Sequence, residues 1–93
     1  MLKAVVLYEQ EPDPARYAQH VDEFVSKVPL KAFRHGKIFG APIGDKRYAY
    51  YAEFEWDDMD AFNEGTRSEG FAASGKDALD MGIPLHVYFV EAN

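Results

Sequence analysis

A stretch rich in aromatic residues, K-R-Y-A-Y-Y-A-E-F-E-W at residues 46–56, constrains this chain more than any other segment. It has the pattern of a β-strand, in which successive side chains point to opposite faces. One face is almost wholly apolar and would carry Tyr48, Tyr50, Ala52, Phe54 and Trp56. The other face is apolar at one end and acidic at the other, with Ala49, Tyr51, Glu53 and Glu55. We expect helices to cover the apolar face.

Three further segments have the pattern of strands. Residues 2–8 (L-K-A-V-V-L-Y) are mostly aliphatic, which is typical of a strand buried on both faces near the centre of a sheet. Residues 32–43 contain two glycines and a proline, so they predict an edge strand with a bulge. The dipeptide Gly44-Asp45 then predicts a hairpin turn into residues 46–56. Residues 84–91 (P-L-H-V-Y-F-V-E) predict the last strand.

Two helical regions separate these strands. Residues 14–28 predict a helix with Asp13 as its N-cap, Pro14 in its first turn and an apolar stripe of Tyr17, Val21, Phe24, Val25 and Val28. After the cap candidates Asp57 and Asp58, we expect a short helix and then a break. A second helix follows from the cap Ser68 to about Met81, and Gly82 ends it.

The order strand–helix–strand–strand–helix–strand predicts one α+β domain over residues 1–93, with the ferredoxin-like fold. Its four-stranded antiparallel sheet would carry both helices on one face, because both crossovers are right-handed. The first and last strands are apolar on both faces, so the open face also needs a cover. We expect a second copy of the chain to provide it, as a homodimer.

Composition excludes several classes of partner. The net charge is -6 and no basic cluster is present, so neither nucleic acid nor an anionic membrane surface is expected to bind. No apolar run is long enough to span a membrane, and no signal peptide is visible. The chain has no cysteine, which removes disulfides, thiolate metal sites and thiol nucleophiles. A cytoplasmic location fits these features.

The candidate chemistry lies with histidine and tyrosine. His20, at the edge of the apolar stripe of the first helix, is the candidate catalytic base, because imidazole changes charge near neutral pH. The candidate ligand-binding residues are Tyr17, Tyr48, Tyr50, His35 and His86. Converging hydroxyl groups in an aromatic lining suit a flat hydrophobic, phenolic or quinone-like ligand. Two interpretations of these tyrosines stay open: they could line a ligand pocket, or they could simply fill a core.

Other polar groups carry weaker signals. The three histidines have no metal-motif spacing, so we expect no metal site and no resident cofactor, although a haem or metal enzyme remains the third alternative. Arg34 could bind a carboxylate or pair with Glu53 or Glu55, and the surface pair is favoured. No phosphate-binding loop, dinucleotide fingerprint or nucleophile elbow is present.

Three segments together resemble the EthD family of the dimeric α+β barrel superfamily. They are L-K-A-V-V-L-Y followed by E-P-D-P-A-R-Y, then R-Y-A-Y-Y-A-E-F-E-W-D-D-M-D-A-F, and then S-E-G-F-A-A-S-G-K-D-A. The resemblance covers nearly the whole chain. It implies a homodimer with a cavity between sheet and helices in each subunit, and a role beside an oxidase or in small-molecule oxidation or isomerisation.

This chain departs from the family where its site histidine is usual. Typical members carry H-x-P-L late in the first helical region, whereas this chain has Lys27-Val28-Pro29-Leu30, or Val28-Pro29 aligns with a later proline. His20 would then substitute geometrically. We expect cofactor-free oxidation or isomerisation of a phenolic or carbonyl compound, with His20 as base and tyrosines stabilising an oxyanion. The alternative is a non-catalytic module that passes a ligand to an oxidase partner.

Overall fold

Strand β1 (Leu2–Tyr8) lies inside a four-stranded antiparallel sheet, between β3 (Tyr50–Trp56) and β4 (Leu85–Glu91). Strand β2 (Ala32–Lys37) is the edge strand beyond β3. The computed structural model describes residues 1–93, and its sheet order β2-β3-β1-β4 confirms the ferredoxin-like prediction. The central position of β1 is confirmed as well. Alternate residues of β1 are fully buried and the residues between them are half-buried, so only one face is sealed within the chain.

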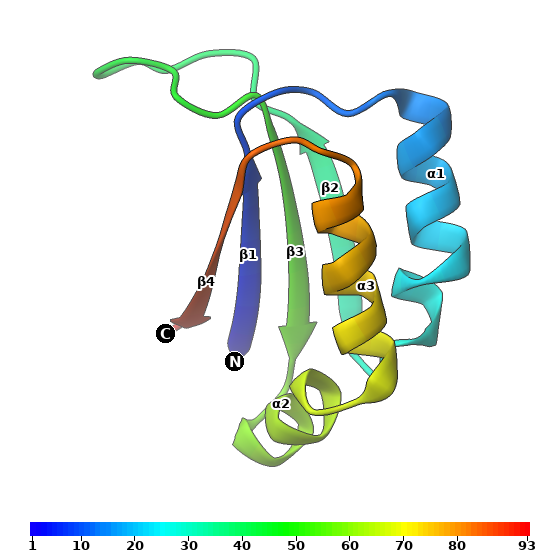
Figure 1. The fold of residues 1–93 in the computed structure, drawn as a ribbon. Coiled ribbons are helices and arrows are strands. Elements are labelled where there is room, and N and C mark those ends of the chain that lie inside the picture. Colours follow the sequence, from blue (N-terminus) through cyan, green and yellow to red (C-terminus); the bar gives the residue numbers. More distant parts are fainter.

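The helices lie on the side of that sealed face (Figure 1). They are α1 (Pro14–Glu23), the short 3-10 turn η1 (Val25–Lys27), α2 (Met59–Thr66) and α3 (Glu69–Asp80). Of these, α1 and α3 lie alongside the strands, and α2 lies at the end of β3. The helices leave the β4 edge bare on the helix side, where Val87 and Phe89 are 46% and 61% exposed. None of the helices is long and apolar enough to cross a membrane.

Helix α1 begins where the sequence predicts and ends earlier. The Asp13 carboxylate accepts a hydrogen bond from the Arg16 backbone N–H, and Pro14 is the first helical residue. The predicted extension to Val28 is wrong, because the α-helix stops at Glu23 and η1 follows. Pro29 disfavours helical backbone at the preceding residue, and Val28 is extended, with φ -86° and ψ 126°.

The second helical region confirms the predicted short helix, break and longer helix. Asp58 caps α2 by accepting from the Ala61 N–H, and Ser68 caps α3 by accepting from the Phe71 N–H. The break packs tightly on its surroundings. A Cβ on Gly65 would clash with Nε1 of Trp56, the same indole nitrogen that donates to the Pro29 carbonyl at 2.7 Å. Only glycine fits at this position.

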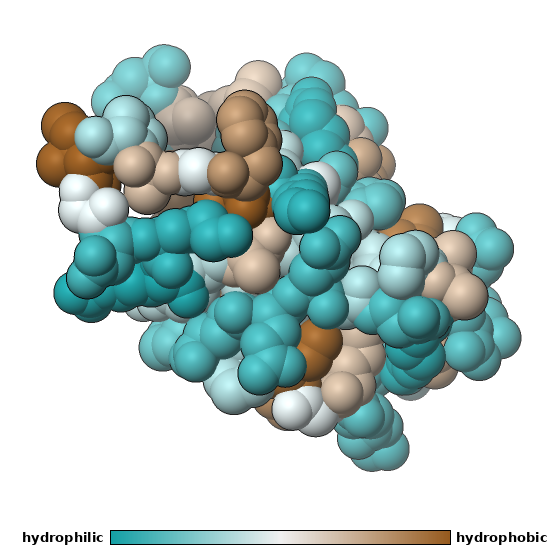
Figure 2. All heavy atoms as spheres, turned by 90° about the horizontal axis from the view of Figure 1, so that it is seen from above, coloured by the Kyte–Doolittle hydropathy of each residue, from teal (hydrophilic) through white to brown (hydrophobic).

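The predicted tight hairpin between the second and third strands is wrong. β2 ends at Lys37 and β3 begins at Tyr50, so residues 38–49 form a long loop. Gly44 adopts φ +77°, and Pro42 has no N–H to donate to a sheet, so both interrupt a regular ladder. Figure 2 looks down on this end of the molecule, where some hydrophobic side chains stand uncovered.

The open face of the sheet mixes ion pairs and apolar side chains. Arg34 donates from Nη1 to Glu53 at 3.1 Å and to Glu55 at 3.0 Å, which confirms the predicted surface pair. Lys3 adds a contact to Glu53 at 3.3 Å. Towards the other edge, Val5 is half-buried and Tyr88 is 51% exposed. This face therefore remains uncovered in the single chain.

Candidate functional site

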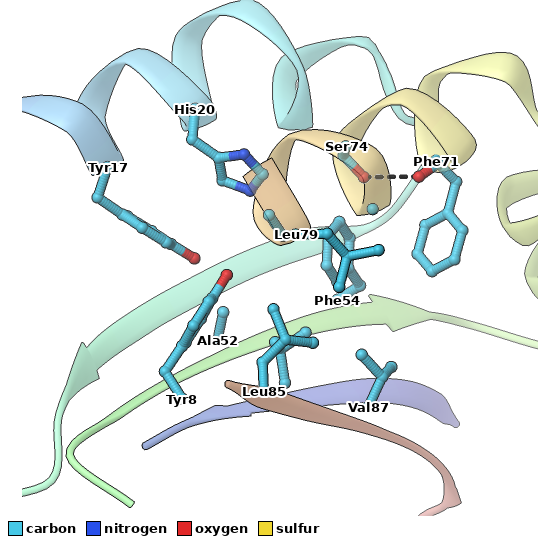
Figure 3. A pocket seen from close by; sticks show the side chains of 13 residues that line it. Tyr8, Tyr17, His20, Ala52, Phe54, Phe71, Ser74, Leu79, Leu85 and Val87 are labelled. Atoms are coloured by element: carbon cyan, nitrogen blue, oxygen red, sulfur yellow. Dashed lines mark hydrogen bonds between the residues drawn. The ribbon is translucent and has the colours of Figure 1, made fainter. Parts of the chain in front are cut away.

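A cavity of about 330 Å³ lies between the helices and the sheet (Figure 3). Its walls come from β1, β3, β4, α1 and α3, and most of the lining side chains are apolar. They are Val6, Tyr8, Tyr17, His20, Ala52, Phe54, Phe71, Ser74, Gly75, Ala78, Leu79, Leu85 and Val87. The volume suits a small ring system, and the lining favours an apolar one.

The polar groups of the cavity gather at one end. Figure 3 shows the hydroxyl groups of Tyr8 and Tyr17 pointing toward each other, with the His20 ring beside them. The Tyr17 hydroxyl is buried and makes no hydrogen bond. Burial raises the pKa of both phenols, so both stay protonated and able to donate. A buried hydroxyl without a partner is costly, and a ligand oxygen would satisfy it.

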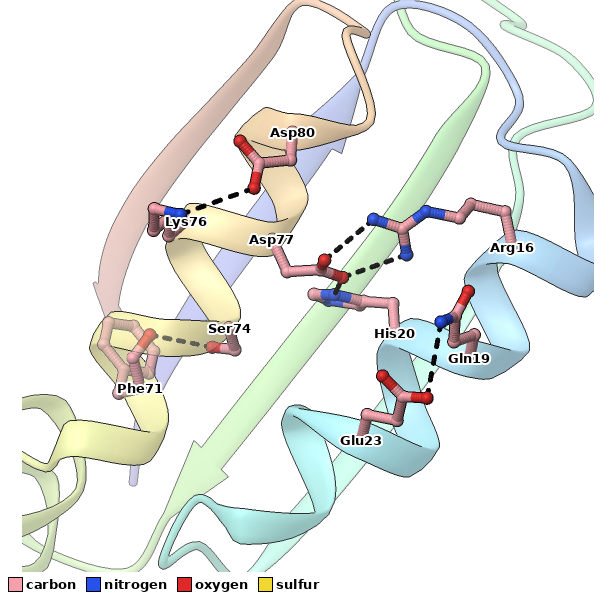
Figure 4. Close-up of polar contacts among 9 residues, drawn as sticks. All are labelled: Arg16, Gln19, His20, Glu23, Phe71, Ser74, Lys76, Asp77 and Asp80. Carbon is pink, nitrogen blue, oxygen red and sulfur yellow. Dashed lines mark hydrogen bonds and ion pairs between the residues drawn. The ribbon is translucent and has the colours of Figure 1, made fainter.

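The ion pair between Arg16 and Asp77 holds the His20 ring in place (Figure 4). Nδ1 of this ring lies 2.8 Å from Oδ2 of Asp77 on α3. Arg16, one helical turn before His20 on α1, donates to both oxygens of that carboxylate, at 3.0 and 2.8 Å. The His20 side chain is only 4% exposed, whereas that of Arg16 is 32% exposed. The pair therefore fixes the imidazole and also joins α1 to α3.

These contacts set the charge state of His20. The Arg16 guanidinium lowers the pKa of Asp77, which remains a carboxylate and can only accept a hydrogen bond. Nδ1 of His20 must therefore carry a proton. Burial lowers the pKa of His20 below its ordinary value even though Asp77 opposes this shift, so the imidazole is neutral near pH 7. Its Nε2 lone pair is free, and Figure 3 shows this nitrogen turned toward the cavity.

A second hollow, a groove of about 410 Å³, lies on the other side of Tyr17. His35 and Tyr50 line it, and the Tyr50 hydroxyl is hydrogen-bonded to Nδ1 of His35. The Tyr17 ring separates the two hollows, with centroid distances of 5.2 Å to His20 and 5.0 Å to His35. The groove is more polar, because Glu11 and Asp22 also line it.

The structure divides the candidate residues into three places. Tyr17 and His20 line the cavity, and His35 and Tyr50 line the groove. Tyr48 and His86 lie in neither hollow, so the expectation that they share a pocket with the others needs correction. Residue 48 belongs to the long loop, because β3 starts two residues later than the alternation requires. Its ring packs on His86 at a centroid distance of 5.7 Å, and His86 faces the open side of the sheet.

Sequence reasoning missed three site residues: Tyr8, Arg16 and Asp77. Tyr8 is the last residue of β1 and lies on the same face as the buried Ala4 and Val6. Alternation alone could therefore have placed it on the helix side. Arg16 precedes His20 by four residues, the spacing of neighbours on a helix. Asp77 is buried in α3, and no local pattern marks a buried acid. No group of three histidine or acidic side chains lies close enough to hold a metal ion.

Comparisons with known proteins rest on structure. No protein-family model matches the sequence, and no curated protein matches it either. Among solved structures, an ethyl tert-butyl ether degradation (EthD) family protein from Bacillus halodurans is similar, with 27% identity and a TM-score of 0.77. That similarity covers 100% of this chain and 99% of the other.

Two more distant structures share the fold. A dimeric ferredoxin-like protein of unknown function from Jannaschia is 20% identical, with a TM-score of 0.72 over 98% of each chain. SnoaB, a cofactor-independent oxygenase from Streptomyces nogalater, is also 20% identical, with a TM-score of 0.63 over 98% of this chain and 91% of that one. The resemblance seen in the sequence is thus confirmed: this chain has the ferredoxin-like fold of an EthD family protein.

Proposed function

We propose that this chain is a homodimeric protein that binds a small, flat, hydrophobic or aromatic molecule in the cavity, with His20 as general base. The observation that carries the proposal is the Asp77–His20 contact of 2.8 Å, backed by Arg16. It leaves a neutral imidazole with its free nitrogen on an apolar cavity. An oriented, neutral histidine in a concave site is the arrangement that proton abstraction requires.

The side chains that line the cavity indicate the polarity and charge of the ligand it can bind. The apolar walls would contact a ring system, and the Tyr17 hydroxyl would donate to one ligand oxygen at the polar end. The lining contains no lysine or arginine, and Arg16, which holds Asp77 beside His20, is already paired with both oxygens of that carboxylate. No lining side chain offers a positive charge to a carboxylate or phosphate. We therefore infer a neutral phenol or ketone.

The proposed reaction is proton transfer at carbon or oxygen. For a ketone, Nε2 of His20 takes a proton from the carbon beside the carbonyl group, the C–H electron pair forms a C=C bond, and the carbonyl oxygen becomes an enolate. Tyr17 donates a hydrogen bond to that oxygen, and Asp77 stabilises the imidazolium. Return of the proton to another carbon completes an isomerisation. Oxidation of the same anion needs dioxygen as the electron acceptor.

Several relatives support dimerisation and redox chemistry as parts of the proposal. Similar structures are described as dimeric, including those from Jannaschia and Thermobifida fusca, and one is described as a cofactor-independent oxygenase. The half-buried apolar side chains of the open face are consistent with a second sheet covering it. We place this homodimer in the cytoplasm.

The test uses two related ring compounds. 2-Tetralone is a neutral bicyclic ketone whose acidic C–H protons exchange with deuterium, and 2-naphthol resembles its enol. We expect the dimer to bind 2-naphthol in isothermal titration calorimetry and to accelerate deuterium exchange of 2-tetralone, measured by NMR. His20→Gln should abolish the acceleration, and the control His86→Gln should keep it. Wild-type protein that neither binds 2-naphthol nor accelerates exchange would refute the proposal.

The alternative is a non-catalytic module that delivers a ligand to an oxidase partner. The bare β4 edge favours it, because the cavity-lining Val87 is 46% exposed and ligand could leave on that side. Binding of 2-naphthol without exchange of 2-tetralone would support this role.

A further inference from the structure

The loop of residues 38–49 carries two large apolar side chains that touch almost nothing. Phe39 is 92% exposed and Ile43 is 91% exposed. Isolated exposed apolar residues are ordinary, but two nearly complete exposures on one projecting loop mark a contact surface. Figure 1 shows this loop extending beyond the end of the sheet. Its own chain provides no cover for it.

The same chain carries an uncovered apolar surface along β4, which we call the β4 strip. Its members lie on the helix side of the sheet and are 40% exposed or more: Leu79, Val87, Phe89 and Met59. Leu79 and Val87 also line the cavity. The Leu79 and Val87 part of the β4 strip is therefore the mouth of the candidate site, whereas Phe89 and Met59 line a separate hollow, and the mouth is open in the single chain.

The charges of the loop are also complementary to those at the β4 edge. Lys46 and Arg47 at the end of the loop are exposed, and neither has an ion pair within the chain. Glu91, at the end of β4 in a hollow beside Phe89, has no ion pair either. In a chain of net charge -6, a locally basic loop is complementary to the acidic remainder of a second copy.

The base of the loop is oriented toward the open side of the sheet. Tyr48 packs on His86, which points to the open face. A second copy covering the open face is therefore the body that the loop would meet first, and the loop would pass around the β4 edge of that copy to reach the strip on its helix side. Each chain carries both the apolar loop and the β4 strip. In a dimer with a two-fold axis, the loop of each copy would therefore contact the strip of the other copy.

We propose that, in the homodimer, the loop of each copy lies across the β4 strip of the other, and that Phe39 and Ile43 close the cavity mouth of the partner. Each site would be incomplete without the second copy. This inference rests on the dimer in the proposed function, and it does not depend on any reaction in the cavity.

Cysteine cross-linking tests the contact directly, because the natural chain has no cysteine. Phe39→Cys protein and Val87→Cys protein are mixed, allowed to exchange subunits and oxidised. We expect a disulfide-linked dimer that contains both chains. The matched control mixes Phe39→Cys with Gln19→Cys, which is exposed on α1, and should give no cross-link. A dimer in solution that links no Val87→Cys chain to Phe39→Cys would overturn the inference, as would a monomer.

Subunit complementation tests the contribution to the site. His20→Gln keeps the loop and loses the base, whereas Phe39→Ser/Ile43→Ser keeps the base and loses the loop contact. Each alone should have low exchange activity toward 2-tetralone. An equal mixture should recover roughly a quarter of the wild-type rate, since half of the randomly paired dimers are mixed and each has one complete site. No recovery in mixed dimers of an active enzyme would show that the loop does not act across the interface.

The two experiments separate the two proposals. If wild-type protein shows no exchange, the proposed reaction fails and the cross-link still decides the loop contact. Binding of 2-naphthol provides a second readout, because an open mouth should weaken it. We expect Phe39→Ser/Ile43→Ser to raise the Kd about tenfold or more, since burying even one such side chain shifts an equilibrium by that factor.

Discussion

Two histidines lie against opposite sides of Tyr17, and their surroundings differ in kind. His20 is buried, its Nδ1 is bonded to a carboxylate, and an arginine fixes that carboxylate. His35 is exposed and its polar partner is the Tyr50 hydroxyl. The first imidazole has one defined proton position and a free nitrogen on an apolar cavity. A histidine alone does not make a candidate base: the carboxylate that fixes its Nδ1 proton, itself held by an arginine, distinguishes His20 from His35.

The largest expected effect separates the two histidines. His20→Gln should lower the rate of 2-tetralone exchange by roughly 100-fold or more, the usual contribution of a positioned base. His35→Gln should change the rate by less than about threefold, because it removes no group from the cavity. NMR exchange rates at saturating ketone provide the measurement. Equal losses in the two variants would remove the distinction between the sites.

A smaller effect is expected at the tyrosines. Tyr17→Phe removes the buried donor and should lower the exchange rate by about 100-fold at most, with little change in the Kd of an apolar ligand without oxygen. Tyr50→Phe is the matched control, since its hydroxyl bonds His35 in the groove. The kcat and KM of each variant are compared. A loss confined to Tyr50→Phe would place the oxyanion in the groove.

Arg16 is a positioning residue, and its removal should act through His20. Arg16→Ala should reduce exchange about tenfold and move the acidic limb of the pH–rate profile to higher pH, because the guanidinium charge lowers the pKa of His20. Arg16→Lys keeps the charge and should largely restore the wild-type limb. A merely structural role would lower the rate without moving the limb.

The smallest effect is a pH dependence of stability. Burial holds the pKa of folded His20 below its ordinary value of 6.5, so in that range the unfolded chain binds more protons. Stability should rise with pH up to about 6.5, with a slope of at most about 1.4 kcal/mol per pH unit from this one group. Urea unfolding of His20→Gln should lose this contribution. An unchanged slope in that variant would mean that other groups cause it.

Local signals were sufficient for most of the fold. Asp13, Asp58 and Ser68 are residue types that commonly cap helices, an aliphatic run marked β1, and alternation marked β3. The sequence pattern gave the wrong strand boundary where contacts between distant parts of the chain determine the structure. Residues 46–49 continue the alternation of β3, but Pro42 and the left-handed Gly44 lead the chain out of the sheet before them.

The site was only half visible in the sequence for a related reason. His20 and Tyr17 were found because they share an apolar stripe on one helix. Asp77 lies 57 positions away along the chain from His20, and only the packing of α3 against α1 brings the two together. Tyr48 was misplaced because β3 begins only at Tyr50, so residue 48 lies in the loop, where strand alternation no longer sets the direction of a side chain.

The stacking of Trp56 on the cavity wall makes the protein its own optical reporter. It is the single tryptophan of the chain and is 1% exposed. Its ring lies 6.0 Å from that of Phe54, nearly parallel, and 6.1 Å from that of Phe71. Both phenylalanines line the cavity, so a ligand that moves them changes the surroundings of one indole. Occupancy of the cavity can thus be followed as fluorescence in the unlabelled natural chain.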